Sequence, residues 1–282
     1  MQNVTLSNGV VMPLEGFGVF QVPDGEQTKQ AVLDAIKTGY RLIDTAAAYY
    51  NEEAVGAAIK ECGVPREELF IVTKLWVQDA GYENAKKAFE TSMKKLGLDY
   101  LDLYLIHQPY GDYYGSWRAM EELYEAKKIR AIGVSNFYND RLLDLCLNVR
   151  IVPHVNQVEV HPFYQQIEAM KLMKEYKIQI MAWAPLAEGK FGIFQNETLK
   201  KIAEAHGKSV AQVALRWNTQ RGVVIIPKSV RQDRMAENLN IWDFKLTDEE
   251  MNEVAKLDKG HSEIVNHYDP EFTKMINSWK IH

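Results

Sequence analysis

Four side chains that could share the movement of one proton lie at or near the ends of three successive apolar runs. Asp44, Lys74 and His107 end these runs, and Tyr49 follows Asp44 by five residues. A tyrosine has a pKa of about 10 and donates a proton poorly at neutral pH. A nearby ammonium lowers that pKa, and a carboxylate would hold the ammonium in place. With a neutral imidazole to orient an oxygen, these groups suit protonation of a developing alkoxide.

Each of these residues also has a purely structural interpretation. Asp44 and Lys74 could be an ion pair that only stabilises the fold, because ion-pair networks also shift pKa values. Tyr49 could be a surface tyrosine, and His107 could be a hydrogen-bonded histidine at a rim. The chemical hypothesis therefore depends on whether the fold brings the four side chains together.

The elements that must position them are eight short apolar runs, which alternate with helix-length amphipathic segments. The runs lie at residues 14–18, 40–45, 69–74, 100–107, 130–136, 153–160, 178–185 and 222–229. Such alternation is typical of parallel βαβ units, and eight of them predict an α/β fold with a (β/α)8 TIM barrel. A doubly wound open sheet is the alternative. We expect a single domain over residues 1–282, because no linker or low-complexity tract divides the chain.

Several runs end with a side chain in phase with the buried positions. Leu101, Leu103 and Leu105 share one face at a period of two, and His107 continues that face. The same phase selects residues at the ends of five other runs, namely Asp44, Lys74, Ser135, Gln157 and Trp183. The interior of a barrel is packed, so such groups fit only at its mouth, where barrel enzymes place their chemistry.

Composition excludes several classes of protein. The 282 residues include 33 basic and 38 acidic side chains, a net charge of −5, which provides no broad basic face for nucleic acid. Cys62 and Cys146 form no CxxC pair, so we expect a reducing, cytoplasmic setting. No signal-peptide pattern and no apolar run of about 20 residues is present, so we expect no membrane partner.

Seven strings, in order along nearly the whole chain, resemble the aldo-keto reductase superfamily. They are DTAAAYYN at 44–51, IVTKLW at 71–76, LYLIHQP at 103–109, IRAIGVSNF at 129–137, NQVEVHP at 156–162, AWAPL at 182–186 and IPKSVRQDRMAEN at 226–238. The pair Gln108-Pro109 after His107 departs from the mammalian branch, which has Trp there, and is similar to the bacterial branch that includes 2,5-diketo-D-gluconate reductases.

The resemblance implies a barrel closed at its bottom by an amino-terminal hairpin, and the Asn8-Gly9 turn agrees with that expectation. We therefore assign residues 1–13 to the hairpin cap and residues 258–282 to a carboxy-terminal tail near the substrate pocket. The implied activity is NADPH-dependent reduction of aldehydes and ketones by hydride transfer. The expected binding partner of the protein is a small-molecule carbonyl substrate, and we expect the protein to be a monomer or a weak homo-oligomer.

Residue roles carried over from the family extend the chemical hypothesis. Tyr49 would be the general acid, Lys74 held by Asp44 would lower its pKa, and His107 would orient the carbonyl oxygen. The residues expected to bind the cofactor are Ser135, Asn136, Gln157, Trp183, Pro185, Leu186, Lys228, Ser229, Val230, Arg234, Glu237 and Asn238.

Within this set, Ser135, Asn136 and Gln157 would hydrogen-bond the nicotinamide carboxamide, and Trp183 would stack on its ring. Lys228, Ser229 and Arg234 suit a phosphate monoester, which favours NADPH over NADH. Arg231 is an extra charge to which no family role transfers.

The substrate residues expected by position are Phe20, Trp76, Gln108 and Tyr110, together with the tail after Leu257, which includes His267, Tyr268 and Trp279. Gln108 and the short loop before the helix expected near Ser116 suggest a wetter, more open pocket and small polar carbonyls. The sequence does not identify the substrate.

Other functions remain as alternatives. One is an NADPH-binding regulatory or sensing subunit of the same fold with very slow turnover, and another is a barrel hydrolase with Asp44 and Glu159 as paired carboxylates. The segment at 16–21 lacks the third glycine of a Rossmann fingerprint. HExxH and a strand-borne His-x-His are absent from the sequence, so we expect no metal.

Overall fold

Eight parallel strands form the centre of the molecule. The computed structural model describes residues 2–23 and 25–282, so Asp24 and Met1, the first residue of the expected hairpin segment, lie outside it. Neighbouring strands in the described sheet are consecutive in the chain, from β3 to β10. These strands are β3 (Phe17–Gly18), β4 (Leu42–Asp44), β5 (Phe70–Leu75), β6 (Leu101–Ile106), β7 (Ile129–Ser135), β8 (Val155–Glu159), β9 (Gln179–Trp183) and β10 (Val224–Ile225).

The first and last strands close the sheet into a barrel. Glu15 bridges Ile225 in parallel, the Gly16 N–H donates to the Ile225 carbonyl at 2.8 Å, and the Ile225 N–H donates to the Leu14 carbonyl at 3.0 Å. The predicted (β/α)8 barrel is therefore confirmed. The doubly wound alternative is wrong, because that fold has open edges and a reversal in its strand order.

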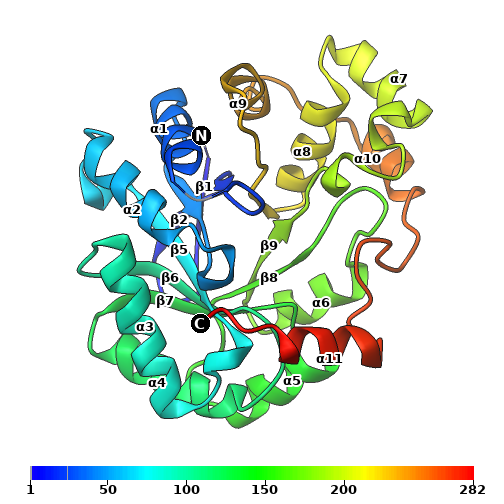
Figure 1. The fold of residues 1–282 in the computed structure, drawn as a ribbon. Coiled ribbons are helices and arrows are strands. Elements are labelled where there is room, and N and C mark those ends of the chain that lie inside the picture. Colours follow the sequence, from blue (N-terminus) through cyan, green and yellow to red (C-terminus); the bar gives the residue numbers. More distant parts are fainter. Residues whose placement is uncertain (1, 24) are drawn as a thin grey trace.

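Helices surround the strands, as Figure 1 shows, and the red end of the chain returns from α11 to the middle of the view. Among the described residues, no helix is both long and apolar enough to span a membrane. The helices are α1 (Glu26–Thr38), α2 (Glu52–Glu61), α3 (Tyr82–Leu96), α4 (Tyr113–Glu125), α5 (Asn139–Asn148), α6 (Ile167–Glu175), α7 (Glu197–His206), α8 (Val210–Gln220), α9 (Gln232–Leu239), α10 (Asp248–Ala255) and α11 (Pro270–Ser278).

Successive side chains along each strand point alternately into the barrel and outward to the helices, which gives two separate layers of hydrophobic core. Leu103 and Leu105 of β6 point into the barrel, while Tyr104 packs outward against Phe89 of α3. The interior is so tightly filled at Gly133 that a Cβ there would overlap the Val155 carbonyl. A packed interior leaves space for a ligand only at the ends of the barrel.

The amino-terminal hairpin fills one of these ends. Strands β1 (Asn3–Thr5) and β2 (Val11–Pro13) pair antiparallel around the Asn8-Gly9 turn. Leu6 and Met12 of this hairpin join the cluster of Leu42 and Phe70, which begin β4 and β5. The hairpin thus covers the end where the strands begin, as expected, and the opposite end remains for the site.

A buried carboxyl lies at the seam where the barrel closes. Glu15 is 0% exposed, Trp242 Nε1 donates to its Oε2 at 3.2 Å, and the Tyr40 hydroxyl lies 3.5 Å from its Oε1. Burial raises the pKa of Glu15 to about 8, although these two contacts lower it. The carboxyl is therefore protonated in the folded protein at neutral pH, whereas a glutamate in the unfolded chain is ionised.

The free energy of unfolding should consequently fall as the pH rises from about 5 to about 8, because the folded state binds one more proton than the unfolded state. This group alone contributes a slope of up to about 1.4 kcal/mol per pH unit. Glu15→Gln keeps the shape without the charge and should remove that slope, so the variant is the more stable protein at pH 8. Urea unfolding at pH 5 to 8 measures this effect. Glu26→Gln, at an exposed site, is the control, and an unchanged slope in Glu15→Gln contradicts the assignment.

Candidate active site

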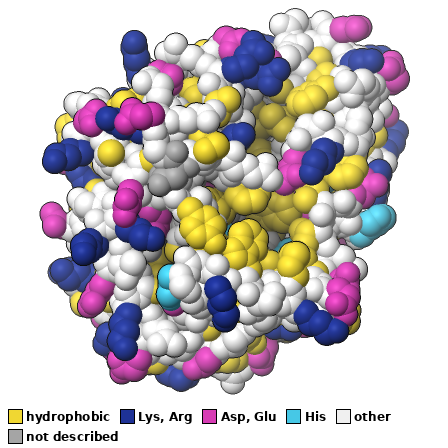
Figure 2. Space-filling model, viewed as in Figure 1, with side chains coloured by type: hydrophobic (Ala, Val, Ile, Leu, Met, Phe, Trp, Pro, Cys, Tyr) yellow, Lys and Arg dark blue, Asp and Glu magenta, His cyan; other side chains and the backbone are white. Residues whose placement is uncertain are grey.

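A cleft of about 930 Å³ opens where the barrel strands end. Figure 2 shows hydrophobic side chains gathered in a hollow at the middle of this face, with charged side chains mostly around it. Every sequence-predicted site residue except Lys74, Tyr110 and Tyr268 lines this cleft; Lys74 and Tyr110 are buried, and Tyr268 is exposed. The lining members are Asp44, Tyr49, His107, Ser135, Asn136, Gln157, Trp183, Pro185, Leu186, Lys228, Ser229, Val230, Arg234, Glu237, Asn238, Phe20, Trp76, Gln108, His267 and Trp279.

Lys74 lies between a carboxylate and a phenol. Its Nζ is 2.6 Å from Asp44 Oδ1 and 3.2 Å from the Tyr49 hydroxyl, and it also donates to the Thr45 carbonyl at 2.9 Å. Asp44 ends β4, Lys74 lies on the neighbouring strand β5, and Tyr49 ends the short 3-10 helix Ala47–Tyr49 that follows β4. Adjacent strands and one tight turn therefore bring the three groups together.

The protonation states follow from burial and charge. Burial raises the pKa of Tyr49 above its usual value and outweighs the Lys74 ammonium, which lowers it. Burial also lowers the pKa of Lys74, but Asp44 and Tyr49 more than compensate and hold it above its usual value. The sequence argument anticipated the effect of Lys74 on Tyr49 but not the larger effect of burial. At neutral pH the phenol therefore keeps the proton that an acid must donate.

His107 completes the group at the end of β6. Its ring meets the Tyr49 ring edge-on at 5.5 Å between centroids and the Trp76 ring at 5.2 Å. Burial lowers the pKa of His107 well below its usual value, and Lys74 lowers it further. The imidazole is therefore neutral at pH 7 and could hydrogen-bond an oxygen without itself carrying a charge.

The three residues expected to bind a carboxamide are hydrogen-bonded to one another, to Asp44 and to the His107 backbone. Gln157 Nε2 donates to Asp44 Oδ2 at 2.8 Å, and the Ser135 hydroxyl donates to the Gln157 carbonyl at 2.9 Å. Asn136 Nδ2 donates to the His107 carbonyl at 3.0 Å. Ser135 ends β7, Asn136 follows it, and Gln157 lies in the middle of β8, so these residues link the expected cofactor wall to Asp44 and His107.

Trp183 is oriented by the same network. Its Nε1 donates to Asn136 Oδ1 at 2.8 Å. Asn136 adopts a left-handed backbone conformation, with a φ of 62°, which asparagine tolerates better than most residues. The backbone turn at Asn136 thus aims its side chain at Trp183 and fixes the indole at the edge of the cleft, where a flat ring could stack on it.

Positive charge gathers in the loop between β10 and α9 and at the start of α9. Lys228 and Arg234 line the cleft, and within residues 2–23 and 25–282 neither forms an ion pair. Arg231 also lines the cleft, but its guanidinium pairs with Asp233. The Ser229 hydroxyl oxygen accepts from the Arg231 N–H at 3.0 Å, which shapes the loop. This end of the cleft suits a phosphate group.

The other end of the cleft is walled mainly by apolar side chains and is partly covered by the tail. Helix α11 brings four residues of the tail to the wall beside Phe20 and Trp76, namely Phe272, Met275, Ile276 and Trp279. Trp76 Nε1 donates to the Trp279 carbonyl at 2.9 Å, which ties the tail to β5. The sequence argument expected the tail, including Trp279, beside the substrate pocket, but it did not single out Phe272, Met275 and Ile276, although their helical spacing after the Asp269-Pro270 start signal marks one apolar face.

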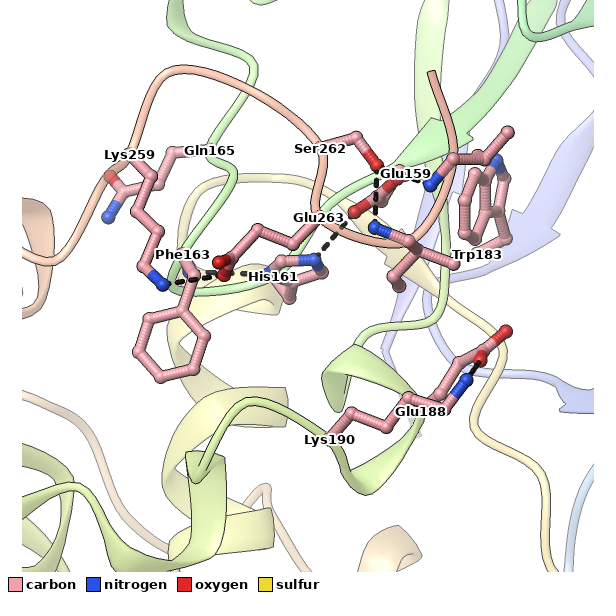
Figure 3. Close-up of polar contacts among 12 residues, drawn as sticks. Glu159, His161, Phe163, Gln165, Trp183, Glu188, Lys190, Lys259, Ser262 and Glu263 are labelled. Carbon is pink, nitrogen blue, oxygen red and sulfur yellow. Dashed lines mark hydrogen bonds and ion pairs between the residues drawn. The ribbon is translucent and has the colours of Figure 1, made fainter. Parts of the chain in front are cut away.

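Figure 3 shows how a second part of the tail is fastened. Glu159, at the end of β8, is fully buried, and its two oxygens contact His161 Nε2 at 2.8 Å and the Ser262 hydroxyl. The Ser262 hydroxyl oxygen in turn accepts from the N–H groups of Ile264 and Val265, at 3.1 and 3.0 Å. Glu159 thus holds the tail segment that places Ile264 and Val265 on the cleft wall.

The same contacts remove support from the hydrolase alternative. Asp44 is bound to Lys74, while Glu159 is bound to His161 and Ser262 and does not line the cleft. Neither carboxylate is therefore placed to act with the other on a bond in the cleft. In the described part of the chain, no three His, Cys, Asp or Glu side chains cluster as metal ligands.

Comparisons with known proteins agree with this geometry. The Aldo/keto reductase family profile matches residues 16–259. The chain is 54% identical over 257 residues to a glyoxal reductase of Bacillus subtilis, covering 91% of this chain and 92% of the relative. It is 51% identical over 258 residues to a 9,11-endoperoxide prostaglandin H2 reductase of Trypanosoma cruzi, covering 91% of each chain.

Solved structures give the same result. An aldo-keto reductase from a Medee basin deep-sea metagenome library superimposes with a TM-score of 0.92 at 43% identity, covering 94% of this chain and 98% of that one. A Bombyx mori aldo-keto reductase in complex with NADP gives a TM-score of 0.88 at 36% identity, covering 94% and 95%. On sequence, fold and the arrangement of its cleft, the chain belongs to the aldo/keto reductase family.

Proposed function

We propose that the protein is an NADP-dependent oxidoreductase that reduces aldehydes and ketones to alcohols, with Tyr49 as the general acid. The observation that carries the proposal is the Lys74 ammonium held between Asp44 and the Tyr49 hydroxyl at the wall of the cleft. The names of the glyoxal and prostaglandin reductases among the relatives support carbonyl or related reductions.

The geometry supports a division of labour during reduction. The protonated Tyr49 hydroxyl donates its proton to the carbonyl oxygen as negative charge develops there. Lys74 then stabilises the phenolate that remains, because it lies 3.2 Å from that oxygen. The neutral His107 imidazole hydrogen-bonds the same carbonyl oxygen and orients it. Asp44 keeps Lys74 charged and in place throughout.

The cleft fits a dinucleotide in both shape and charge. NADPH, when bound, supplies the hydride that reduces the carbonyl carbon. Trp183 would stack on the nicotinamide, and Ser135, Asn136 and Gln157 would hold its carboxamide beside Tyr49. At the other end, Lys228, Ser229 and Arg234 would bind the 2′-phosphate, with Val230, Glu237 and Asn238 near the adenine and with Pro185 and Leu186 along the chain between them.

Tyr49→Phe removes the proton donor without changing the size of the ring, so kcat for aldehyde reduction should fall at least about 100-fold. NADPH binding, measured by quenching of tryptophan fluorescence, should be retained. Tyr82→Phe is the matched control and should keep full activity, because the Tyr82 hydroxyl contacts Glu122 of α4 and Tyr82 does not line the cleft. A Tyr49→Phe protein with normal turnover would overturn the assignment of the acid.

Arg234→Ala should weaken NADPH binding about tenfold or more while leaving NADH binding nearly unchanged, because a charge-assisted bond to the 2′-phosphate is lost. Calorimetric titration with both cofactors measures the difference. Arg231→Ala is the control, since Asp233 already neutralises that side chain. Equal losses for the two cofactors in Arg234→Ala would mean that this residue does not contact the phosphate.

A further inference from the structure

Tyr49 lies on a short loop whose two ends are joined by side chains. The loop runs from Thr45, directly after β4, to Asn51, directly before α2. The Thr45 hydroxyl donates to Asn51 Oδ1 at 2.8 Å, and both residues are completely buried. This hydrogen bond therefore fixes the span of the loop that carries Tyr49.

Thr45 connects the closure of this loop to the buried ammonium. Its carbonyl accepts from Lys74 Nζ at 2.9 Å, and its N–H donates to the Val72 carbonyl of β5 at 2.9 Å. The backbone of Thr45 is thus held on the strand that carries Lys74, while its side chain holds the far end of the loop. A displacement of Asn51 would therefore move Tyr49 relative to Lys74, whose Nζ lies 3.2 Å from the Tyr49 hydroxyl.

The Asn51 amide also holds a second loop. Its Nδ2 donates to the carbonyls of Val19 at 3.0 Å and Val22 at 3.1 Å, on the loop that follows β3. Phe20, between these two residues, lines the cleft and packs on the Tyr49 ring at 4.9 Å between centroids. One buried amide thus supports Tyr49 from two sides, through the loop that carries it and through the ring that packs on it.

We propose that Asn51 is a positioning residue that keeps the Tyr49 hydroxyl within hydrogen-bond reach of Lys74 and of a substrate carbonyl. The inference rests on the proposed role of Tyr49 in carbonyl reduction. An asparagine amide has two N–H donors and one acceptor oxygen, and Asn51 uses all three groups within the chain. Its effect on the reaction is therefore transmitted through Tyr49, and a displacement of about 1 Å in a reacting group can lower a rate about 100-fold.

Substitution of Thr45 tests the closure of the loop without removing the amide. Thr45→Val keeps the shape of the side chain but removes the hydroxyl, so the rate of NADPH oxidation in a single turnover with saturating aldehyde should fall about 10- to 100-fold. Thr45→Ser keeps the hydroxyl and should restore most of the rate. NADPH binding, measured by titration, should be retained in both variants, because the residues proposed to hold the cofactor lie on other strands and loops.

Thr219→Val is the matched control. It removes another buried hydroxyl, which bonds to the Arg216 carbonyl within α8 away from the cleft lining, so the single-turnover rate should be unchanged. The proposal is overturned if Thr45→Val keeps the wild-type rate or if Thr45→Ser is as slow as Thr45→Val. It is also overturned if NADPH binding is lost together with the rate, because that result indicates a general structural defect.

A second variant tests whether Thr45 acts through Asn51. Asn51→Leu removes all the hydrogen bonds of the amide and should slow the single turnover at least as much as Thr45→Val. The double variant should be little slower than Asn51→Leu alone, because the effects of two residues that share one interaction are not additive. Losses that simply multiply would contradict the proposal, and the comparison of Thr45→Val with Thr45→Ser decides alone if Asn51→Leu does not fold.

Failure of this inference is distinguishable from failure of the proposed function. If Tyr49→Phe turns over normally, the assignment of the acid is wrong, and the positioning role falls with it. If Tyr49→Phe is inactive while Thr45→Val keeps the wild-type rate, only the positioning role of Asn51 is wrong.

Discussion

The ammonium of Lys74, which is completely removed from solvent, is the constraint on which the site depends. Burying one charge is very unfavourable, and removing one partner from a buried ion pair typically destabilises a protein by about 3–5 kcal/mol. Lys74 is therefore stable only because Asp44 Oδ1 lies 2.6 Å away and the Thr45 carbonyl accepts a second bond. The Tyr49 hydroxyl is the third hydrogen-bond partner of this ammonium, so the need to satisfy the buried charge also places the phenol that we propose as the acid.

The hydrogen bonds around Lys74 continue well beyond Asp44 and Tyr49. The second oxygen of Asp44 accepts from Gln157, Ser135 donates to the Gln157 carbonyl, and Asn136 in turn holds Trp183. A continuous set of hydrogen bonds thus runs from β4 to β9 along the carboxyl end of the barrel. Because its members belong to different strands, the set is complete only in the closed barrel, and the positions of Tyr49 and of the Trp183 indole are fixed together.

Local sequence was sufficient for the barrel and for most of the site. A period of two along each strand, followed by one more in-phase residue, selects the side chains that reach the mouth, and His107 after Leu105 shows the pattern clearly. Burial could not be obtained in this way, so the rise in the pKa of Tyr49 was missed. The family resemblance placed the tail and Trp279 near the substrate pocket, but the bond from Trp76 Nε1 to the Trp279 carbonyl joins residues 203 apart in the chain and could not be obtained from local sequence.

The separate anchoring of the tail has a consequence for how such a protein can change its selectivity. The segment that carries Ile264 and Val265 is fastened through Ser262 to Glu159, and the segment that carries His267 is fastened through Tyr110. Neither anchor includes a member of the group around Lys74. Substitutions in the tail can therefore alter the shape of the cleft without disturbing the buried charge that positions Tyr49, whereas a change at Asp44 or Lys74 affects both the position of Tyr49 and stability. The chain thus keeps the polar groups around Lys74 on the barrel strands and part of the cleft wall on a carboxy-terminal segment that is fastened separately.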